Sequence, residues 1–180
     1  MLFWILAAAI IFWGIASYNS LVGLKVRSQN AWSDIDVQLK RRYELIPNLV
    51  STVKGYAAHE NKLFNEITET RSRAMQVQSP QEKGEAETKL SGSVKNLLAV
   101  AEGYPQLKAS DNFLALQKSL SEIEDALQSA RRYYNAVVRD YNTKQGVFPD
   151  LAVAKLGGFG PKEFFQLDSA EESKSLKVSF

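Results

Sequence analysis

Residues Met1–Leu24 have the sequence MLFWILAAAIIFWGIASYNSLVGL, and no charged side chain occurs before Lys25. As an α-helix, the purely apolar part (residues 1–16) would be about 24 Å long and the whole uncharged stretch about 36 Å. The hydrocarbon core of a bilayer is about 30 Å thick, so the apolar part is slightly short and the whole stretch is sufficient. The sequence therefore predicts a transmembrane anchor helix over residues 1–24.

Two other interpretations of this stretch compete with the membrane helix. A cleaved signal peptide would need a charged segment before its apolar segment, although Ala7–Ala9 mimics a small-residue cleavage site. The alternative is a buried core helix, but tryptophans at both ends of the apolar run are typical of membrane–water interfaces and favour a span. The candidate anchor residues are Trp4, Ile10, Ile11 and Trp13.

The distribution of basic residues predicts the orientation of the anchor. Lys25 and Arg27, and further on residues 40–42, all lie on its C-terminal side. Because positively charged segments stay in the cytoplasm, we expect a single-pass membrane protein with its N-terminus outside and its body in the cytoplasm. The small side chains of Ala7, Gly14 and Ser17 would permit close helix packing in the bilayer, which favours a homo-oligomer.

Composition limits the chemistry of the chain. The 180 residues include 22 basic and 20 acidic side chains, a net charge of +2 that does not indicate nucleic-acid binding. There is no cysteine, and His59 is the single histidine, so thiolate sites and histidine metal sites lack ligands. We expect no cofactor, no metal, no catalytic residues and no nucleic-acid partner.

Apolar residues after the anchor recur in steps of three and four, the spacing of helices that pack against helices. The seam residues are Trp32, Ile35, Leu39, Ile46, Leu49, Val53, Leu63 and Ile67, and Arg42 fills one intervening position. A turn must interrupt so long a rod, either at Pro47 or at Gly55–His59. We favour Gly55–His59, because Leu45–Val50 contains few loop-forming residues.

Three further boundaries are visible. Ser79 and Pro80 are suited to cap and begin a helix, which Gly103 to Pro105 would end. Ser110 or Asp111 would cap a last long helix that ends at residues 146–149. The fold class predicted is all-α, with the anchor helix continuing into an antiparallel four-helix bundle over residues 25–146.

The C-terminal part is predicted as two segments. Residues 147–167 are apolar and turn-rich and should lie near the membrane end of the bundle, either at the lipid surface or as a cover for the bundle. Residues 168–180 are charged and serine-rich, which predicts a flexible tail.

Several motifs resemble those of the LemA family of bacterial membrane-anchored helical proteins. They cover essentially residues 1–165, and the block from Gln38 to Val50 is the most specific. The matching stretches are 18–19, 21–22, 31–43, 45–50, 53–56, 59–60, 99–105, 107–109, 133–135, 141–142, 148–149, 158–159 and 164–165. The chain departs from the family at Phe164–Gln166, where members often have Tyr-Phe-Glu, and in the tail.

This resemblance implies a four-helix bundle on one membrane helix in the bacterial inner membrane, with the N-terminus outside and the body in the cytoplasm. It implies no catalytic residues. Some relatives are associated with magnetosome membranes, which points toward organising or shaping membranes.

Two groups of residues are candidates for interactions. Lys40, Arg41 and Arg42 form a basic patch that could pair with acidic faces within the bundle, bind a partner protein or touch anionic lipid. His59 is a turn or capping residue or, because histidine can change protonation near neutral pH, a switch.

The sequence thus predicts a non-enzymatic, self-associating scaffold or adaptor whose partners are the lipid bilayer, other copies and a membrane protein. The alternative is a regulator or sensor partner of a membrane enzyme such as a protease.

Overall fold

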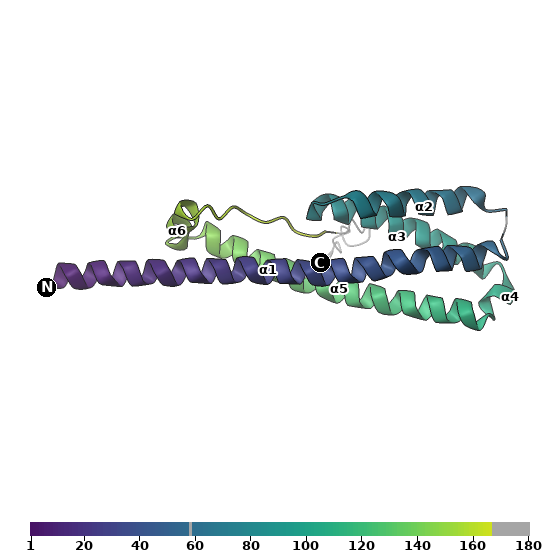
Figure 1. The fold of residues 1–180 in the computed structure, drawn as a ribbon, viewed down its shortest axis with the longest axis horizontal. Helices are drawn as coiled ribbons and strands as arrows, with labels where there is room; N and C mark the ends of the chain where they lie inside the picture. The colour runs from purple at the N-terminus through teal and green to yellow at the C-terminus, as the bar shows by residue number, and fades with distance from the viewer. Residues whose placement is uncertain (58, 167–180) are drawn as a thin grey trace, which may run out of the picture. The chain divides into compact units, whose positions relative to one another are not determined.

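A computed structural model describes residues 1–57 and 59–166, and this part of the chain is helical and contains no strand (Figure 1). The all-α prediction is therefore confirmed. The helices are α1 (Leu2–Lys54), α2 (Asn61–Gln76), α3 (Pro80–Glu102), α4 (Pro105–Lys108), α5 (Asp111–Gly146) and α6 (Asp150–Leu156). The predicted tail, residues 168–180, lies outside the described residues.

Most predicted helix boundaries are confirmed. Helix α1 is unbroken from Leu2 to Lys54 with Pro47 inside it, and α2 begins at Asn61, so the connection lies at Gly55–His59 and not at Pro47. Ser79 caps α3 as expected: its hydroxyl accepts a hydrogen bond from the backbone N–H of Glu82 at 3.2 Å, and Pro80 is the first helical residue.

The chain forms two compact units. The first unit contains residues 1–36 and 129–164, and the second contains residues 37–128 together with Phe165 and Gln166 among the described residues. Helices α1 and α5 each contribute residues to both units. The predicted division of the chain at residues 24, 146 and 167 stays a prediction.

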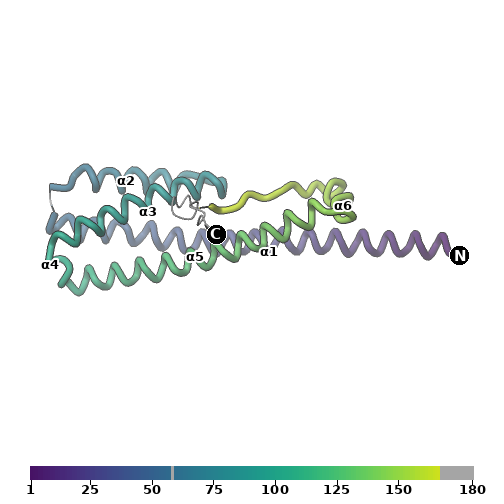
Figure 2. Tube along the Cα trace, turned by 180° about the vertical axis from the view of Figure 1, so that it is seen from behind, coloured from purple at the N-terminus to yellow at the C-terminus, as the bar shows by residue number. Residues whose placement is uncertain are grey.

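In the first unit, α1 buries one narrow stripe. The buried positions are Ser17, Leu21, Ser28, Ala31 and Ile35, spaced by three, four or seven residues. Leu21 packs in one cluster with Tyr141 of α5, Ala154 of α6 and Phe159. Figure 2 shows α6 and the extended segment that follows it beside the end of α5. The first unit is therefore held together by three helices and an extended strap (residues 159–164).

In the second unit, apolar side chains from five helices, α1 to α5, form the core. The fully buried ones include Leu39, Ile46, Leu49, Ile67, Leu90, Leu97 and Leu107. Helices α2 and α3 lie side by side in both views (Figures 1 and 2). Of the predicted seam positions in this unit, Leu39, Ile46, Leu49, Val53 and Ile67 are buried and Leu63 is half-buried. In the first unit, Ile35 is buried and Trp32 is half-buried.

Two short helices, α4 and α6, were not predicted, because each is a single turn or two within sequence rich in proline and glycine. The end of α6 has a clear local cause. Gly158 adopts a left-handed φ of 68°, and the N–H of Phe159 bonds the carbonyl of Ala154 at 2.9 Å, as in a Schellman motif.

Candidate functional site

The first candidate surface is the exposed apolar part of α1. Trp4, Ile10, Ile11 and Trp13 are all exposed, as are most side chains before Ser17. Helix α1 contains one segment long and apolar enough to cross a membrane, and little of that segment is buried. Soluble monomers rarely expose so large an apolar surface, so this part of α1 indicates membrane association.

Asp150 joins three helices where the buried stripe of α1 begins. The Ser17 hydroxyl on α1 donates a hydrogen bond to its Oδ1, and the Lys144 ammonium on α5 lies 3.0 Å from its Oδ2. Asp150 itself is the first residue of α6. The Ser17 hydrogen bond, with the Lys144 charge, holds the pKa of Asp150 below its usual value. This contact also occupies Ser17. Of the three small residues expected to allow close packing with another helix, Ala7 and Gly14 therefore remain candidates.

An aromatic contact continues the same junction. The ring of Phe159 packs against Tyr18 with centroids 5.4 Å apart, and the Lys25 ammonium lies 5.9 Å from the Phe159 centroid. A Cβ on Gly157 would come within 2.6 Å of the Phe159 ring, so only glycine allows this close packing. The end of α6 is thus fitted to α1 by specific side chains.

The extended strap after α6 is tied to α5 through its backbone. The Tyr141 hydroxyl donates to the Gly160 carbonyl at 3.0 Å, and the Asn142 amide pairs with both the N–H and the carbonyl of Lys162 at 2.9 Å. The Tyr134 hydroxyl donates to the Glu163 carbonyl at 2.9 Å, and burial raises the pKa of Tyr134 to about 12. An extended segment without a neighbouring strand needs such side-chain partners for its backbone.

The second unit contains a different candidate, a network of charged side chains around Arg42. Arg42 is 1% exposed and Glu87 is 0% exposed, and the Arg42 Nη1 lies 2.5 Å from a Glu87 oxygen. The Arg42 Nη2 lies 2.8 Å from a Glu124 oxygen and 2.7 Å from the Ser91 hydroxyl. The Arg42 guanidinium therefore joins α1, α3 and α5.

Two carboxylates share this one guanidinium, which affects the titration of the more exposed carboxylate. Burial raises the pKa of Glu124, and the Glu87 charge adds to the increase, while Arg42 opposes it. The Tyr43 hydroxyl donates to the other oxygen of Glu87. The Arg42 Nε has no hydrogen-bond partner within the described part of the chain.

Pro47 creates a second polar contact between helices. Proline has no N–H, so the carbonyl of Tyr43, four residues earlier, lacks its usual helical donor. Arg71 of α2 supplies one instead, with its Nε 2.8 Å from that carbonyl oxygen. Pro47 thus leaves α1 unbroken, and the carbonyl that it deprives of a donor is a point of contact between α1 and α2.

The predicted basic patch is divided by its burial. Lys40 and Arg41 are exposed, whereas Arg42 is inside the core and bonded to Glu87 and Glu124. For Arg42 the structure supports the interpretation that it pairs with acidic groups inside the body. A surface role for Lys40 and Arg41 stays a prediction.

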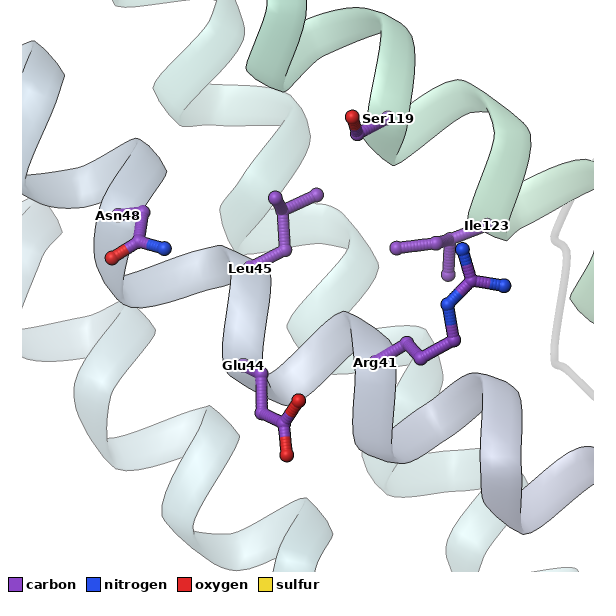
Figure 3. Close-up of a pocket in the computed structure, with 6 residues that line it drawn as sticks. All are labelled: Arg41, Glu44, Leu45, Asn48, Ser119 and Ile123. Carbon is purple, nitrogen blue, oxygen red and sulfur yellow. The ribbon is translucent and has the colours of Figure 1, made fainter.

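An open groove of about 280 Å³ lies beside Arg41. Its lining residues are Arg41, Glu44, Leu45, Asn48, Ser119 and Ile123. Figure 3 shows the Arg41 guanidinium beside Ile123, while the Glu44 carboxylate points away from it. The polar groups therefore do not converge on one point, and the groove is not built like an active site.

His59 is exposed in the connection between α1 and α2, and its role as a switch stays a prediction. Within the described residues, no group of three or more His, Cys, Asp or Glu side chains is placed to hold a metal ion.

Comparison with known proteins identifies the family of this chain. The sequence profile of the LemA family matches residues 31–180. The chain belongs to the LemA family. The region shared with the family includes the Arg42 network, the Pro47 contact and the whole of α6.

Three LemA-related proteins are similar over most of the chain. Magnetosome protein MamQ 2 of Paramagnetospirillum magneticum (strain AMB-1) is 26% identical over 175 residues, which is 83% of this chain and 64% of MamQ 2. MamQ of Magnetospirillum gryphiswaldense (strain MSR-1) is 24% identical, covering 82% of this chain and 64% of that protein. Protein LemA of Metamycoplasma hominis is 29% identical, covering 86% of this chain and 72% of that protein. The match thus spans less than two thirds of the length of the MamQ proteins.

Proposed function

We propose that this LemA-family chain is a non-enzymatic, single-pass membrane protein that acts as a self-associating scaffold or adaptor. In this proposal the apolar part of α1 crosses the bacterial inner membrane with the N-terminus outside, and the second unit lies in the cytoplasm. There the parts of α1, α2, α3 and α5 form an antiparallel four-helix bundle.

The observation that carries the proposal is the continuity of α1. Its exposed apolar residues and the buried residues that build the protein body belong to one uninterrupted helix, Leu2–Lys54. A flexible linker would let the apolar segment move independently of the buried part of the first unit, whereas one uninterrupted helix joins the two directly. A scaffold that presents a defined face at a membrane requires such a connection.

The relatives support the membrane context. Two of them carry the name magnetosome protein, and their sequences match this chain over 83% and 82% of its length. On the proposal, this chain organises or shapes membrane through lateral assembly, with Ala7 and Gly14 on the helix face that contacts another copy.

The experiment that tests assembly is a mass measurement by light scattering in mild detergent. It compares the full-length protein with a variant that lacks residues 1–16. We expect an oligomer for the full-length protein and a smaller species for the truncated one, because the membrane helix contributes to the contact. A monomer in both samples would contradict self-association.

Orientation needs its own test. Alkaline phosphatase is active only outside the cytoplasm. Green fluorescent protein fluoresces in the cytoplasm but not after export in unfolded form. Fused after Phe180, the fluorescent reporter should be bright and the phosphatase inactive. The opposite pattern would place the body outside and overturn the predicted orientation.

A further inference from the structure

We infer that α6, together with Val147 and Phe148 before it, binds the headgroup layer of an anionic lipid bilayer beside the membrane helix. This inference rests on the proposed membrane span of α1. It adds a second lipid-binding element that lies in a part of the chain far from the anchor in sequence.

The level at which α6 packs along α1 is the first argument. A bilayer core of about 30 Å takes up about 20 residues of helix. In α1 the apolar run gives way to polar side chains at Ser17 and to the first charge at Lys25, so the edge of the core falls between them. Helix α6 is bonded to Ser17 through Asp150 and shares a cluster with Leu21. A helix held at this level of α1 lies at the boundary between acyl chains and headgroups.

The second argument is the exposure of large apolar side chains on this element. Phe148 is 85% exposed and Leu156 is 90% exposed, and Val147 is exposed as well. These side chains flank α6 at its two ends, while Ala154 on the opposite side is buried in the first unit. Amphipathic elements with this distribution lie in the membrane interface.

Continuity with the membrane helix identifies lipid as the occupant. Leu156 and Val153 line a single open, mainly apolar groove with Ile11, Ile15 and Tyr18 of α1. The apolar surface of α6 is therefore an extension of the apolar surface that crosses the bilayer. A lipid that covers Ile11 and Ile15 also covers Leu156.

Charge supports an anionic headgroup. Lys25 lies beside the Phe159 ring, Lys162 lies 6.0 Å from the Tyr141 centroid, and both rings belong to the cluster around α6. The two ammonium groups repel each other, and burial together with the nearby Lys25 charge lowers the pKa of Lys162. The Asp150 carboxylate of α6 is already bonded to Lys144. A lipid phosphate would offset this excess positive charge.

Single cysteines test the inference, because the natural chain has none. Phe148→Cys and Leu156→Cys are labelled with a polarity-sensitive fluorophore and reconstituted in vesicles of phosphatidylethanolamine and phosphatidylglycerol. Leu114→Cys is the matched control, because Leu114 is an exposed leucine (48%) in the second unit. Brominated lipids then quench labels that lie in the bilayer, and aqueous iodide quenches labels that lie in water.

We expect brominated lipid to quench the labels at residues 148 and 156 several-fold more than the label at residue 114, with the reverse order for iodide. In vesicles of phosphatidylcholine alone, the quenching of both labels by brominated lipid should fall. Equal quenching in the two compositions would overturn the preference for anionic lipid.

Flotation of the same vesicles separates the two proposals. If the protein floats with the vesicles but iodide reaches residues 148 and 156 as readily as residue 114, the inference about α6 is wrong and the membrane span stands. If the protein does not float, the span itself is wrong.

Discussion

In the first unit, apolar side chains from Leu2 to Ile15 are exposed, whereas the second unit buries Arg42 and Glu87 almost completely. Each arrangement is unfavourable in isolation, for opposite reasons. Exposed apolar surface is costly in water, and buried charge is costly in a protein core. The second unit compensates internally, because the Arg42 guanidinium pairs with the carboxylates of Glu87 and Glu124. The first unit requires compensation from outside the chain, and a lipid bilayer supplies it.

The largest expected effect comes from removing the internal compensation. Arg42→Met would leave the Glu87 carboxylate buried without its cation, and the loss of one partner of such a pair costs about 3–5 kcal/mol. Urea unfolding of the full-length protein in mild detergent, followed by circular dichroism, measures this cost. Arg41→Met is the control, because Arg41 is exposed and should change the free energy of unfolding by no more than about 0.5 kcal/mol.

A double variant sharpens this result. Arg42→Met combined with Glu87→Leu removes both buried charges, and we expect it to recover most of the lost stability. A double variant as unstable as Arg42→Met alone would mean that packing, not charge pairing, accounts for the effect.

Two glycines of α3 should respond in opposite directions. A Cβ on Gly84 would collide with the backbone carbonyl of Gln166, whereas a Cβ on Gly92 meets nothing within 4 Å. Gly84→Ala should destabilise the second unit by about 1–3 kcal/mol by displacing Phe165 and Gln166. Gly92→Ala should stabilise it by about 0.5–1 kcal/mol, because alanine favours helix. Thermal unfolding of both variants decides, and a Gly84→Ala variant as stable as Gly92→Ala would show that the contact does not form.

The Pro47 contact predicts a coupling of about 1 kcal/mol. Arg71→Ala removes the donor to the Tyr43 carbonyl and should cost about 1–2 kcal/mol. With Pro47→Ala, the helix regains its own N–H donor at this carbonyl, so the cost of Arg71→Ala should shrink. A double-mutant cycle by urea unfolding measures the difference. Equal costs in both backgrounds would rule out the compensation.

Acid should affect the two units with opposite signs, and this is the smallest effect. The pKa of Glu124 is raised in the folded protein. Its contribution to the free energy of unfolding is therefore fully present below the usual pKa of 4.5 and is lost as the pH rises through the pKa of the folded state. The lowered pKa of Asp150 means that its contribution is present above the usual value of 3.8 and is lost as pH falls through the folded value.

Stability measured from neutral pH down to about 4.5 should therefore rise slightly in the wild type through Glu124, and Glu124→Gln should remove that part of the slope. Below pH 3.8, the contribution of Asp150 to stability is lost as the pH falls. Asp150→Asn should therefore flatten the dependence of stability on pH in this acidic range. Unchanged slopes in both variants would show that neither carboxylate titrates as its surroundings imply.

Much of the fold could be predicted because its signals are local. Seam spacing identified Ile35, Leu39 and Ile46 as core residues, and Ser79 with Pro80 marked a helix start that the structure reproduces. The placement of Arg42 was harder, because its position in the seam indicated burial while its basic neighbours indicated a surface patch. Position in the seam was the better guide: only the partners Glu87 and Glu124, distant in sequence, make the burial tolerable.

The contacts that define the candidate sites were not predictable in this way. The Ser17–Asp150 hydrogen bond joins residues 133 positions apart, and no spacing rule relates them. Only one partner of the Arg71 contact could be predicted from the sequence. Pro47 implies that the Tyr43 carbonyl lacks its helical donor, but it does not indicate which residue donates instead. Helix α6 was missed because seven residues are too few to show a helical period.

The central claim is that lipid covers α1 up to the level at which its buried stripe begins. A cysteine scan of α1 from Leu2 to Val26 in vesicles, with brominated lipid and iodide as quenchers, tests it most directly. We expect lipid contact at every exposed position from Leu2 to Ile15, a change between Ser17 and Leu21, and water contact at Val26. Iodide access to residues 6–12 equal to that at Val26 would contradict it.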